Sequence, residues 1–248
     1  MRVLTSTILA LLLTLSGQWQ IPMSTGATAG GSAPATKPSY IQSCVNYVAG
    51  TTSSISCTFA SAVTAGDQIY ACGTNDSSFT FSLTGDSGTW TADPNLTANY
   101  TGYPANYTNC SYLSTAGGGE TTLTLTESGL GYIYLNAVEI RNGVFDTSDA
   151  GATNVGSPVS GNSITTSAAN DLVLGYANVG GSSKETCTAG TNFAWILPST
   201  SVIEPTNGGC TGIEYYVYPS AAAISVQMVY SATSNQGWAS HIAAFKPK

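Results

Sequence analysis

Short runs of β-branched and aromatic residues recur along this chain between clusters of turn-forming residues, which is the pattern of strands joined by turns. Beyond the N-terminal segment, no window shows the apolar period of a helix. We therefore predict an all-β fold. The predicted strands lie near residues 40–48, 53–60, 67–74, 78–84, 106–114, 121–127, 131–141, 162–166, 170–177, 193–198, 211–218, 222–230 and 238–246.

Two of these runs indicate where their strands lie in a sheet. The stretch from Thr122 to Thr126 alternates Thr with Leu, so one of its faces is expected to contact solvent. The stretch from Asp171 to Tyr176 is apolar on both faces, which is typical of a strand at the centre of a sheet. The fold is therefore expected to contain both a solvated sheet surface and a fully covered one.

The two halves of the chain share a sequence pattern. Residues 65–73 are similar to residues 169–177, and in each half an alternating run follows and leads into a second apolar strand. Two similar halves interleaved in one sandwich would explain this pattern. The alternative is that alternating β sequences simply resemble one another. In either case we predict a single β-sandwich domain of jelly-roll type over residues 40–248.

The N-terminus has the features of an export signal. Arg2 precedes an apolar run from Val3 to Leu15, which is too short to span a bilayer comfortably. The sequence Ala27-Thr28-Ala29 fits a small-residue cleavage pattern, although cleavage nearer Gly17 is an alternative. We predict a signal peptide over residues 1–29, a flexible linker over residues 30–39, and a secreted extracellular or periplasmic protein with no membrane attachment after cleavage.

All six cysteines follow this leader, and an even number of cysteines in an exported chain predicts disulfides. Zinc is the competing interpretation, but the chain has no C-x-x-C pair and a single histidine. Fifteen pairings of six cysteines exist. We favour pairing between neighbours in the sequence, with the first pair facing each other across a hairpin. The favoured pairs are Cys44 with Cys57, Cys72 with Cys110, and Cys187 with Cys210.

The charge of the chain excludes two classes of partner. Only 8% of the residues are charged and the net charge is −7, so Ser, Thr, Asn, Gln and Gly must solvate most of the surface. Nucleic-acid binding needs clustered Lys and Arg, whereas the few basic residues of the mature chain are scattered. An anionic membrane surface is disfavoured for the same reason.

Several short motifs give this chain a family resemblance. They are Gly66-Asp67-Gln68-Ile69, Asp86-Ser87-Gly88-Thr89-Trp90, Ala169-Asn170-Asp171-Leu172-Val173-Leu174 and the terminal Ala243-Ala244-Phe245-Lys246-Pro247. With these motifs the chain resembles a loose group of secreted bacterial β-sandwich proteins, over most of residues 40–248. The resemblance implies a fold and an export route, and it offers no catalytic motif.

Candidate catalytic groups are few. His241 is the single histidine, and its alternation with apolar neighbours predicts a core residue rather than a catalytic one. Glycoside hydrolysis needs only two carboxylates, and Glu139 in an apolar strand is the best candidate for one of them. The competing interpretation is an ion pair between Glu139 and Arg141 near the sheet edge. Glu214 is a candidate partner, although the sequence does not place it near Glu139.

Metals and cofactors have weak support. Asp146 with Asp149, and Asp76 with Asp86, supply the hard oxygens that calcium prefers. Neither pair resembles an EF-hand loop, and Asx-turns explain these aspartates equally well. No phosphate-binding glycine motif precedes a helix. We therefore predict no metal site and no cofactor.

The most unusual stretch, residues 95–112, interleaves tyrosines with asparagines. Aromatic rings pack against the C–H faces of sugars and amides bind their hydroxyls, so this composition favours a glycan site. The alternative is a packed turn region at the edge of the sandwich. The candidate ligand-binding residues are Trp90, Tyr100, Tyr103, Tyr107 and Asn109.

Three functions remain compatible with the sequence. The favoured one is a non-catalytic extracellular binding protein whose partner is a polysaccharide or another glycan. The second is a self-associating structural subunit of a surface layer, matrix or filament. The third is a carbohydrate-active enzyme that uses Glu139, and we favour a protein that is not an enzyme. Fold alone does not decide among them.

Overall fold

A computed structural model describes residues 35–75, 81–93, 98–100, 106–180, 186–196, 202–203, 210–231 and 237–248. Residues 35–248 form one compact unit. The predicted signal peptide and the first part of the predicted linker lie outside the described residues. Throughout the described ranges the regular secondary structure is β-strand, with no helix, which confirms the all-β prediction.

The N-terminal half of this unit builds one seven-stranded antiparallel sheet, which we call the N-terminal sheet. Its strand order is β1-β7-β2-β6-β4, with β3 also pairing with β7 and β5 with β6. The strands are β1 (Ser39–Thr58), β2 (Gln68–Asn75), β3 (Phe81–Thr84), β4 (Trp90–Ala92), β5 (Ala98–Tyr100), β6 (Asn106–Leu113) and β7 (Thr122–Arg141).

The C-terminal half builds a second seven-stranded sheet, the C-terminal sheet, in the order β13-β15-β11-β18-β8, with β14 pairing with β15 and β9 with β18. Two short ribbons, β10–β16 and β12–β17, accompany it. The strands of this half are β8 (Gly143–Ser148), β9 (Ala152–Val155), β10 (Ser163–Thr165), β11 (Asp171–Val179), β12 (Cys187–Thr188), β13 (Ala194–Trp195), β14 (Val202–Ile203), β15 (Cys210–Tyr218), β16 (Ala223–Ser225), β17 (Val229–Tyr230) and β18 (Gly237–Pro247).

The two sheets have related strand orders. In the N-terminal sheet β2 lies between β7 and β6, and in the C-terminal sheet β11 lies between β18 and β15. These central strands are the two segments whose sequences are similar. Each half forms its own sheet, however, so the expectation of interleaved halves was wrong. An internal duplication and the jelly-roll topology stay predictions.

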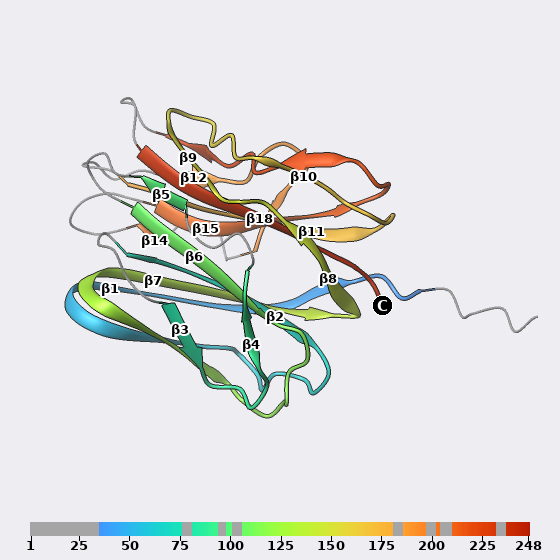
Figure 1. Cartoon of the computed structure of the whole chain (residues 1–248), viewed down its shortest axis with the longest axis horizontal. Helices are drawn as coiled ribbons and strands as arrows, with labels where there is room; N and C mark the ends of the chain where they lie inside the picture. Colours follow the sequence, from blue (N-terminus) through green and yellow to red (C-terminus); the bar gives the residue numbers. More distant parts are fainter. Residues whose placement is uncertain are drawn as a thin grey trace, which may run out of the picture. The chain divides into compact units, whose positions relative to one another are not determined.

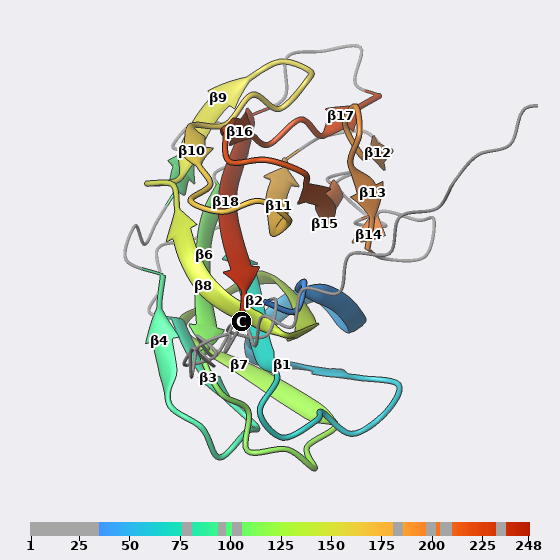
Figure 2. The ribbon, with the colours of Figure 1, turned by 90° about the vertical axis from the view of Figure 1, so that its right-hand side faces the viewer.

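The sheets pack face to face, which confirms the β-sandwich (Figures 1 and 2). Their shared core takes residues from β2, β6 and β7 on one side and from β11, β15 and β18 on the other. Phe245 of β18 belongs to this core, with its ring 5.7 Å from that of Tyr70 and 5.8 Å from that of Phe145, both edge-on. Such edge-to-face packing of aromatic rings is favourable beyond the area buried.

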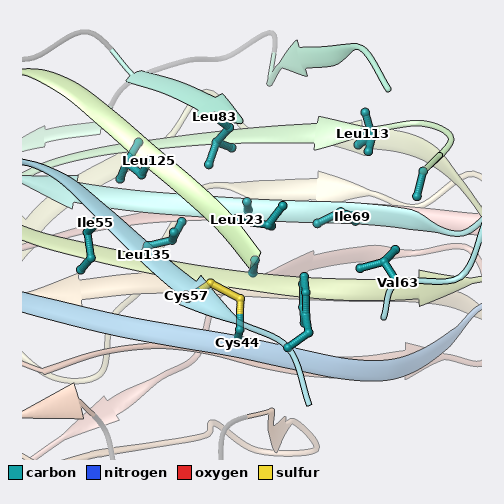
Figure 3. Packing of buried hydrophobic residues seen from close by; sticks show 14 of the residues in the cluster. Cys44, Ile55, Cys57, Val63, Ile69, Leu83, Leu113, Leu123, Leu125 and Leu135 are labelled. Atoms are coloured by element: carbon teal, nitrogen blue, oxygen red, sulfur yellow. A yellow bond between two sulfur atoms is a disulfide. The ribbon is translucent and has the colours of Figure 1, made fainter. Parts of the chain in front are cut away.

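A second core lies on the other side of the N-terminal sheet, where β1 and β7 are long and bent. Residues 39–48 of β1 pair with the end of β7, and residues 54–58 pair with its beginning. Both ends of each strand thereby line one core, with Leu123 and Leu125 facing inward (Figure 3). Each of these strands had been expected as two. The alternating burial of residues 122–127 confirms the predicted solvated face.

Three disulfides join Cys44 with Cys57, Cys72 with Cys110, and Cys187 with Cys210, and the described residues contain no free cysteine. The predicted pairing is therefore confirmed. The first bond does not cross a hairpin, however. Cys44 and Cys57 belong to the same bent strand, where they pair with Ala137 and Leu123 of β7. Three disulfides are consistent with an oxidising extracellular environment.

Other strand boundaries also differ from the prediction, and β8 shows why. A single residue, Asn142, separates β7 from β8 and carries the chain from one sheet to the other. Its φ of 58° lies in the left-handed region, which Asn tolerates better than most residues. Asn142-Gly143 is a turn-forming pair, and the strand predicted over 131–141 ends here as β7 does, but no strand was predicted over the residues of β8.

Candidate ligand-binding site

A pocket of about 170 Å³ lies on the face of the C-terminal sheet that is turned away from the N-terminal sheet. Five of its lining residues carry a side-chain amide or an aliphatic hydroxyl, three are aromatic and none is charged. Pockets for drug-sized molecules measure about 300–1,000 Å³, so this one fits a single small ring. The lining residues are Ser163, Thr191, Asn192, Phe193, Tyr216, Tyr218, Ala223, Ile224, Ser225 and Gln227.

The aromatic wall of the pocket comes from β15 and from the turn before β13. Tyr216 and Tyr218 alternate along β15 and therefore share a face of the sheet. The ring centroid of Tyr216 lies 5.9 Å from that of Phe193 and 5.4 Å from that of Tyr218. All three side chains are half-buried. Their contact with one another fixes the rings at this wall of the pocket.

A tight turn over residues 190–193 forms another wall. The backbone N–H of Phe193 donates to the carbonyl of Gly190 at 3.1 Å, and Asn192 has a left-handed φ of 71°. A Cβ at position 190 would lie 2.3 Å from the carbonyl oxygen of Gln227. Only glycine fits there, because the turn approaches the segment before β17 so closely.

Glu214 lies on the same face of β15 as Tyr216, behind the pocket, and is completely buried. Its Oε2 accepts the backbone N–H of Gly190 at 2.7 Å, and its Oε1 accepts that of Gln227 at 2.7 Å. Burial raises the pKa of this carboxyl to about 7, although the backbone hydrogen bonds oppose the rise. One carboxylate therefore holds two walls of the pocket.

One feature of the sequence points to this site, a run of tyrosines in the strand predicted over residues 211–218. Three tyrosines occur within the four residues 215–218, and the run was interpreted only as a strand. Tyr216 and Tyr218 line the pocket, whereas Tyr215 packs toward the shared core beside Tyr40. The approach of Phe193 and Gln227 to these rings had no sequence signal, because it depends on how separate segments pack.

The predicted ligand-binding residues lie elsewhere, in and beside β6. Trp90 is half-buried against the core of the N-terminal sheet and pairs with Leu113. Tyr107 lies six residues away along β6, which corresponds to about 20 Å in a strand. The structure therefore does not bring Trp90 and Tyr107 into one small site.

The remaining members of that prediction are only partly described. Asn109 is half-buried opposite Gly73. The backbone of Tyr100 pairs with Asn106 in the β5–β6 ribbon, and Tyr103 lies outside the described residues. A binding role for these residues stays a prediction.

The environment of Glu139 differs from the predicted ion pair. Arg141 Nη2 lies 3.1 Å from Asp67 Oδ2 and not against Glu139. Glu139 instead accepts the backbone N–H of Thr64 at 2.8 Å and the Nε2 of Gln42 at 2.6 Å. Its strand β7 lies inside the sheet, between β1 and β2, rather than at an edge. Burial raises the pKa of Asp67; Arg141 opposes that rise and Glu139 adds to it.

The two carboxylates considered for hydrolysis are not on one face of the sandwich. Glu139 lies on the strand face that lines the N-terminal core, with Leu135 and Ala137. Glu214 lies against Val226 in a third core, which covers the face of the C-terminal sheet turned away from the N-terminal sheet and which we call the C-terminal core. Each faces away from the core that the sheets share, so they do not meet in one cleft as glycoside hydrolysis requires.

We expect Glu139→Gln to lower the free energy of unfolding by about 1–3 kcal/mol, because the new amide would place a donor against the N–H of Thr64 or the amide of Gln42. Urea unfolding measures this, and Glu120→Gln, at an exposed site, serves as the control. Loss of a glycan-hydrolysing activity with an unchanged unfolding curve would contradict this structural role.

His241 is a core residue, as predicted. It is 1% exposed, its Nε2 lies 3.3 Å from the carbonyl of Thr108 in the other sheet, and its Nδ1 lies 3.7 Å from Asp149 Oδ1. Asp149 in turn accepts the backbone N–H of Ile242. These contacts link β18 to β6 and to the end of β8, and they leave the imidazole without access to a substrate.

The aspartates considered for calcium have protein partners. Asp86 accepts the N–H of Gly88, two residues ahead, which is the expected Asx-turn. Asp146 binds Lys246 and the N–H of Ser167. Asp76 lies outside the described residues. Within the described ranges, no three His, Cys, Asp or Glu side chains gather as a metal site.

Comparison with protein-family models, curated proteins and solved structures finds no match to this chain. The part of the chain that the structure describes contains no helix able to cross a membrane.

Proposed function

We propose that this protein is an exported, non-catalytic glycan-binding protein and that the pocket on the C-terminal sheet binds one sugar ring. The observation that carries the proposal is the lining, which combines three aromatic rings with five amide or hydroxyl side chains and no charge. Aromatic faces suit the apolar face of a sugar, and the polar groups suit its hydroxyls. The three disulfides and the signal-like N-terminus support export.

The chemistry of the pocket selects a neutral ligand. The described lining residues include no Lys or Arg to pair with a carboxylate, sulfate or phosphate group. The buried carboxyl of Glu214 behind the wall also disfavours an anion. The pocket volume suits the terminal residue or one internal residue of a chain, with the rest of the glycan in solvent.

We expect Tyr218→Ala to weaken glycan binding about fivefold, because loss of one aromatic contact costs about 1 kcal/mol. Gln227→Ala should also weaken it, since the change removes an amide that lines the pocket and keeps the backbone N–H that binds Glu214. The measurement is a neutral-glycan array followed by titration calorimetry with the best oligosaccharide. Val217→Ala, at an exposed position adjacent to Tyr218 in β15, is the matched control.

The same titrations compare the two candidate sites. Tyr100→Ala and Tyr103→Ala test the segment that the sequence favoured, while Tyr218→Ala tests the pocket. If only the first two variants lose affinity, the glycan site is at β5–β6 and the pocket proposal is wrong. If no neutral glycan binds at all, the proposed function fails.

A structural subunit is the second candidate, and one observation favours it. Strand β1 lies at the edge of the N-terminal sheet and, among the described residues, pairs only with β7. Three register shifts interrupt this edge, between Tyr40 and Gln42 and on both sides of Thr52, and such irregularities hinder strand addition. Polymers that grow with protein concentration in sedimentation experiments would favour this candidate.

A further inference from the structure

We propose that Glu214 is the positioning residue of the pocket, whose ionised carboxylate holds the 190–193 turn and the segment at Gln227 at the separation that admits a ligand. The effect on ligand binding rests on the proposed function. The effect on the pocket walls does not, because the carboxylate contacts them directly. Glu214 itself is not among the lining residues and so would act through the walls rather than touch the ligand.

The hydrogen bonds give Glu214 this role. Its Oε2 accepts the backbone N–H of Gly190 on one wall and its Oε1 that of Gln227 on the other, both at 2.7 Å, and the backbone of Met228, next to Gln227, adds a further hydrogen bond. Gly190 in turn accepts the N–H of Phe193, so the position of this aromatic side chain depends on the bond to Glu214. The two walls come from segments that are far apart in the chain, since Gly190 and Gln227 are separated by 37 residues (227 − 190).

Among the residues that the structure describes, no charged side chain is paired with this carboxylate. Of the elements packed against it, β11 presents Gly175, β13 pairs at Trp195, and the segment before β17 presents Val226 and Gln227. None of these residues is titratable, and the pKa of about 7 reflects burial opposed by backbone hydrogen bonds. The group therefore changes its charge near neutral pH.

Protonation is expected to loosen both walls. A carboxylate accepts two charge-assisted hydrogen bonds, whereas a carboxylic acid accepts weaker ones and adds a proton that needs its own acceptor. Above pH 7 the ionised form dominates and the walls are held; below pH 7 the neutral form dominates and they are released. Ligand affinity should therefore fall as the pH is lowered through about 7.

The first test needs no ligand. In a ¹H–¹⁵N NMR titration from pH 5 to 9, the amide resonances of Gly190 and Gln227 should shift together with a midpoint near pH 7. The Ser167 amide is the internal control. It donates to Asp146. Burial alone would raise the pKa of this carboxyl, but hydrogen bonds from Ser167 and Lys246 lower it below the ordinary value of 3.8. Constant Gly190 and Gln227 resonances over this range would overturn the proposal.

The second test measures binding, with the best neutral oligosaccharide from the array as the probe. We expect wild-type affinity to be about fivefold weaker at pH 5.5 than at pH 8.5, from the difference between a charged and a neutral acceptor. Glu214→Gln replaces one acceptor by a donor, so it should bind weakly and equally at both pH values. Glu139→Gln, a buried carboxyl that also accepts a backbone N–H, should keep the wild-type pH dependence.

The outcomes separate the two proposals. If the wild-type amides titrate but affinity does not change with pH, Glu214 does not position the ligand site and the inference is wrong. If the amides titrate and no glycan binds at either pH, the proposed function is wrong, but the role of Glu214 in holding the two walls stands. If Glu214→Gln does not fold, the wild-type titration alone still decides whether the carboxylate of Glu214 holds the two walls.

Discussion

Removal of the Cys72–Cys110 disulfide, by changing both residues to Ala, is expected to lower the free energy of unfolding by about 4 kcal/mol. The bond closes a loop of 38 residues, and a longer loop restricts the unfolded chain more than a shorter one. Both cysteines are also completely buried in the core shared by the two sheets, directly opposite each other on β2 and β6. The loss should therefore weaken the packing of the sandwich itself.

Chemical denaturation of the double variant, under non-reducing conditions, measures this loss. The matched comparison is the Cys44→Ala, Cys57→Ala variant, whose loop is only 13 residues long and which should lose about 3 kcal/mol. The reverse order would show that chain entropy does not determine these contributions. A loss below about 1 kcal/mol for the longer loop would contradict the prediction outright.

The stability of the wild-type protein should fall as the pH rises from about 4.5 to about 7, because of Glu214. The pKa of this carboxyl is about 7 when folded, against an ordinary value of 4.5, so the folded state binds the proton more tightly than the unfolded state. In this window each rise in pH favours unfolding, and the full contribution is roughly 3 kcal/mol. Above about pH 7 the contribution is constant.

Urea unfolding at pH 5 and pH 9, for wild type and Glu214→Gln, isolates this effect. Burial also raises the pKa of Asp67 and Asp171, so some dependence on pH will remain in both proteins. The difference in stability between the two pH values should nevertheless be roughly 2.5 kcal/mol smaller in the variant, because part of the effect is already present at pH 5. Equal differences in the two proteins would show that Glu214 has an ordinary pKa.

Glu214 thus has opposite expected effects on stability and on binding. Ionisation weakens the fold, because a charge is left in an apolar environment, and the same ionisation holds the pocket walls at Gly190 and Gln227. A glutamine of similar size would avoid the cost of the charge. A buried charge that lowers stability is a common mark of a functional position, which agrees with the proposed role of this pocket.

The sequence by itself determined the features that depend on local pattern. Alternation of Thr and Leu identified the solvated face of β7, and the doubly apolar run at Asp171 identified the central strand β11. The cysteine pairs were also correct, because each pair joins cysteines that are neighbours along the chain and lie within the same half of the fold.

Tertiary structure alone decided which distant residues meet. Arg141 has Glu139 two residues away in its own strand, yet it pairs with Asp67 at the start of the neighbouring strand. Likewise, the residues that surround Tyr216 in the pocket come from turns and ribbons whose positions follow from the packing of the C-terminal core. Periodicity determines the face of a strand on which a side chain lies, whereas its partner depends on strand order and register, and these are set by burial over the whole sandwich.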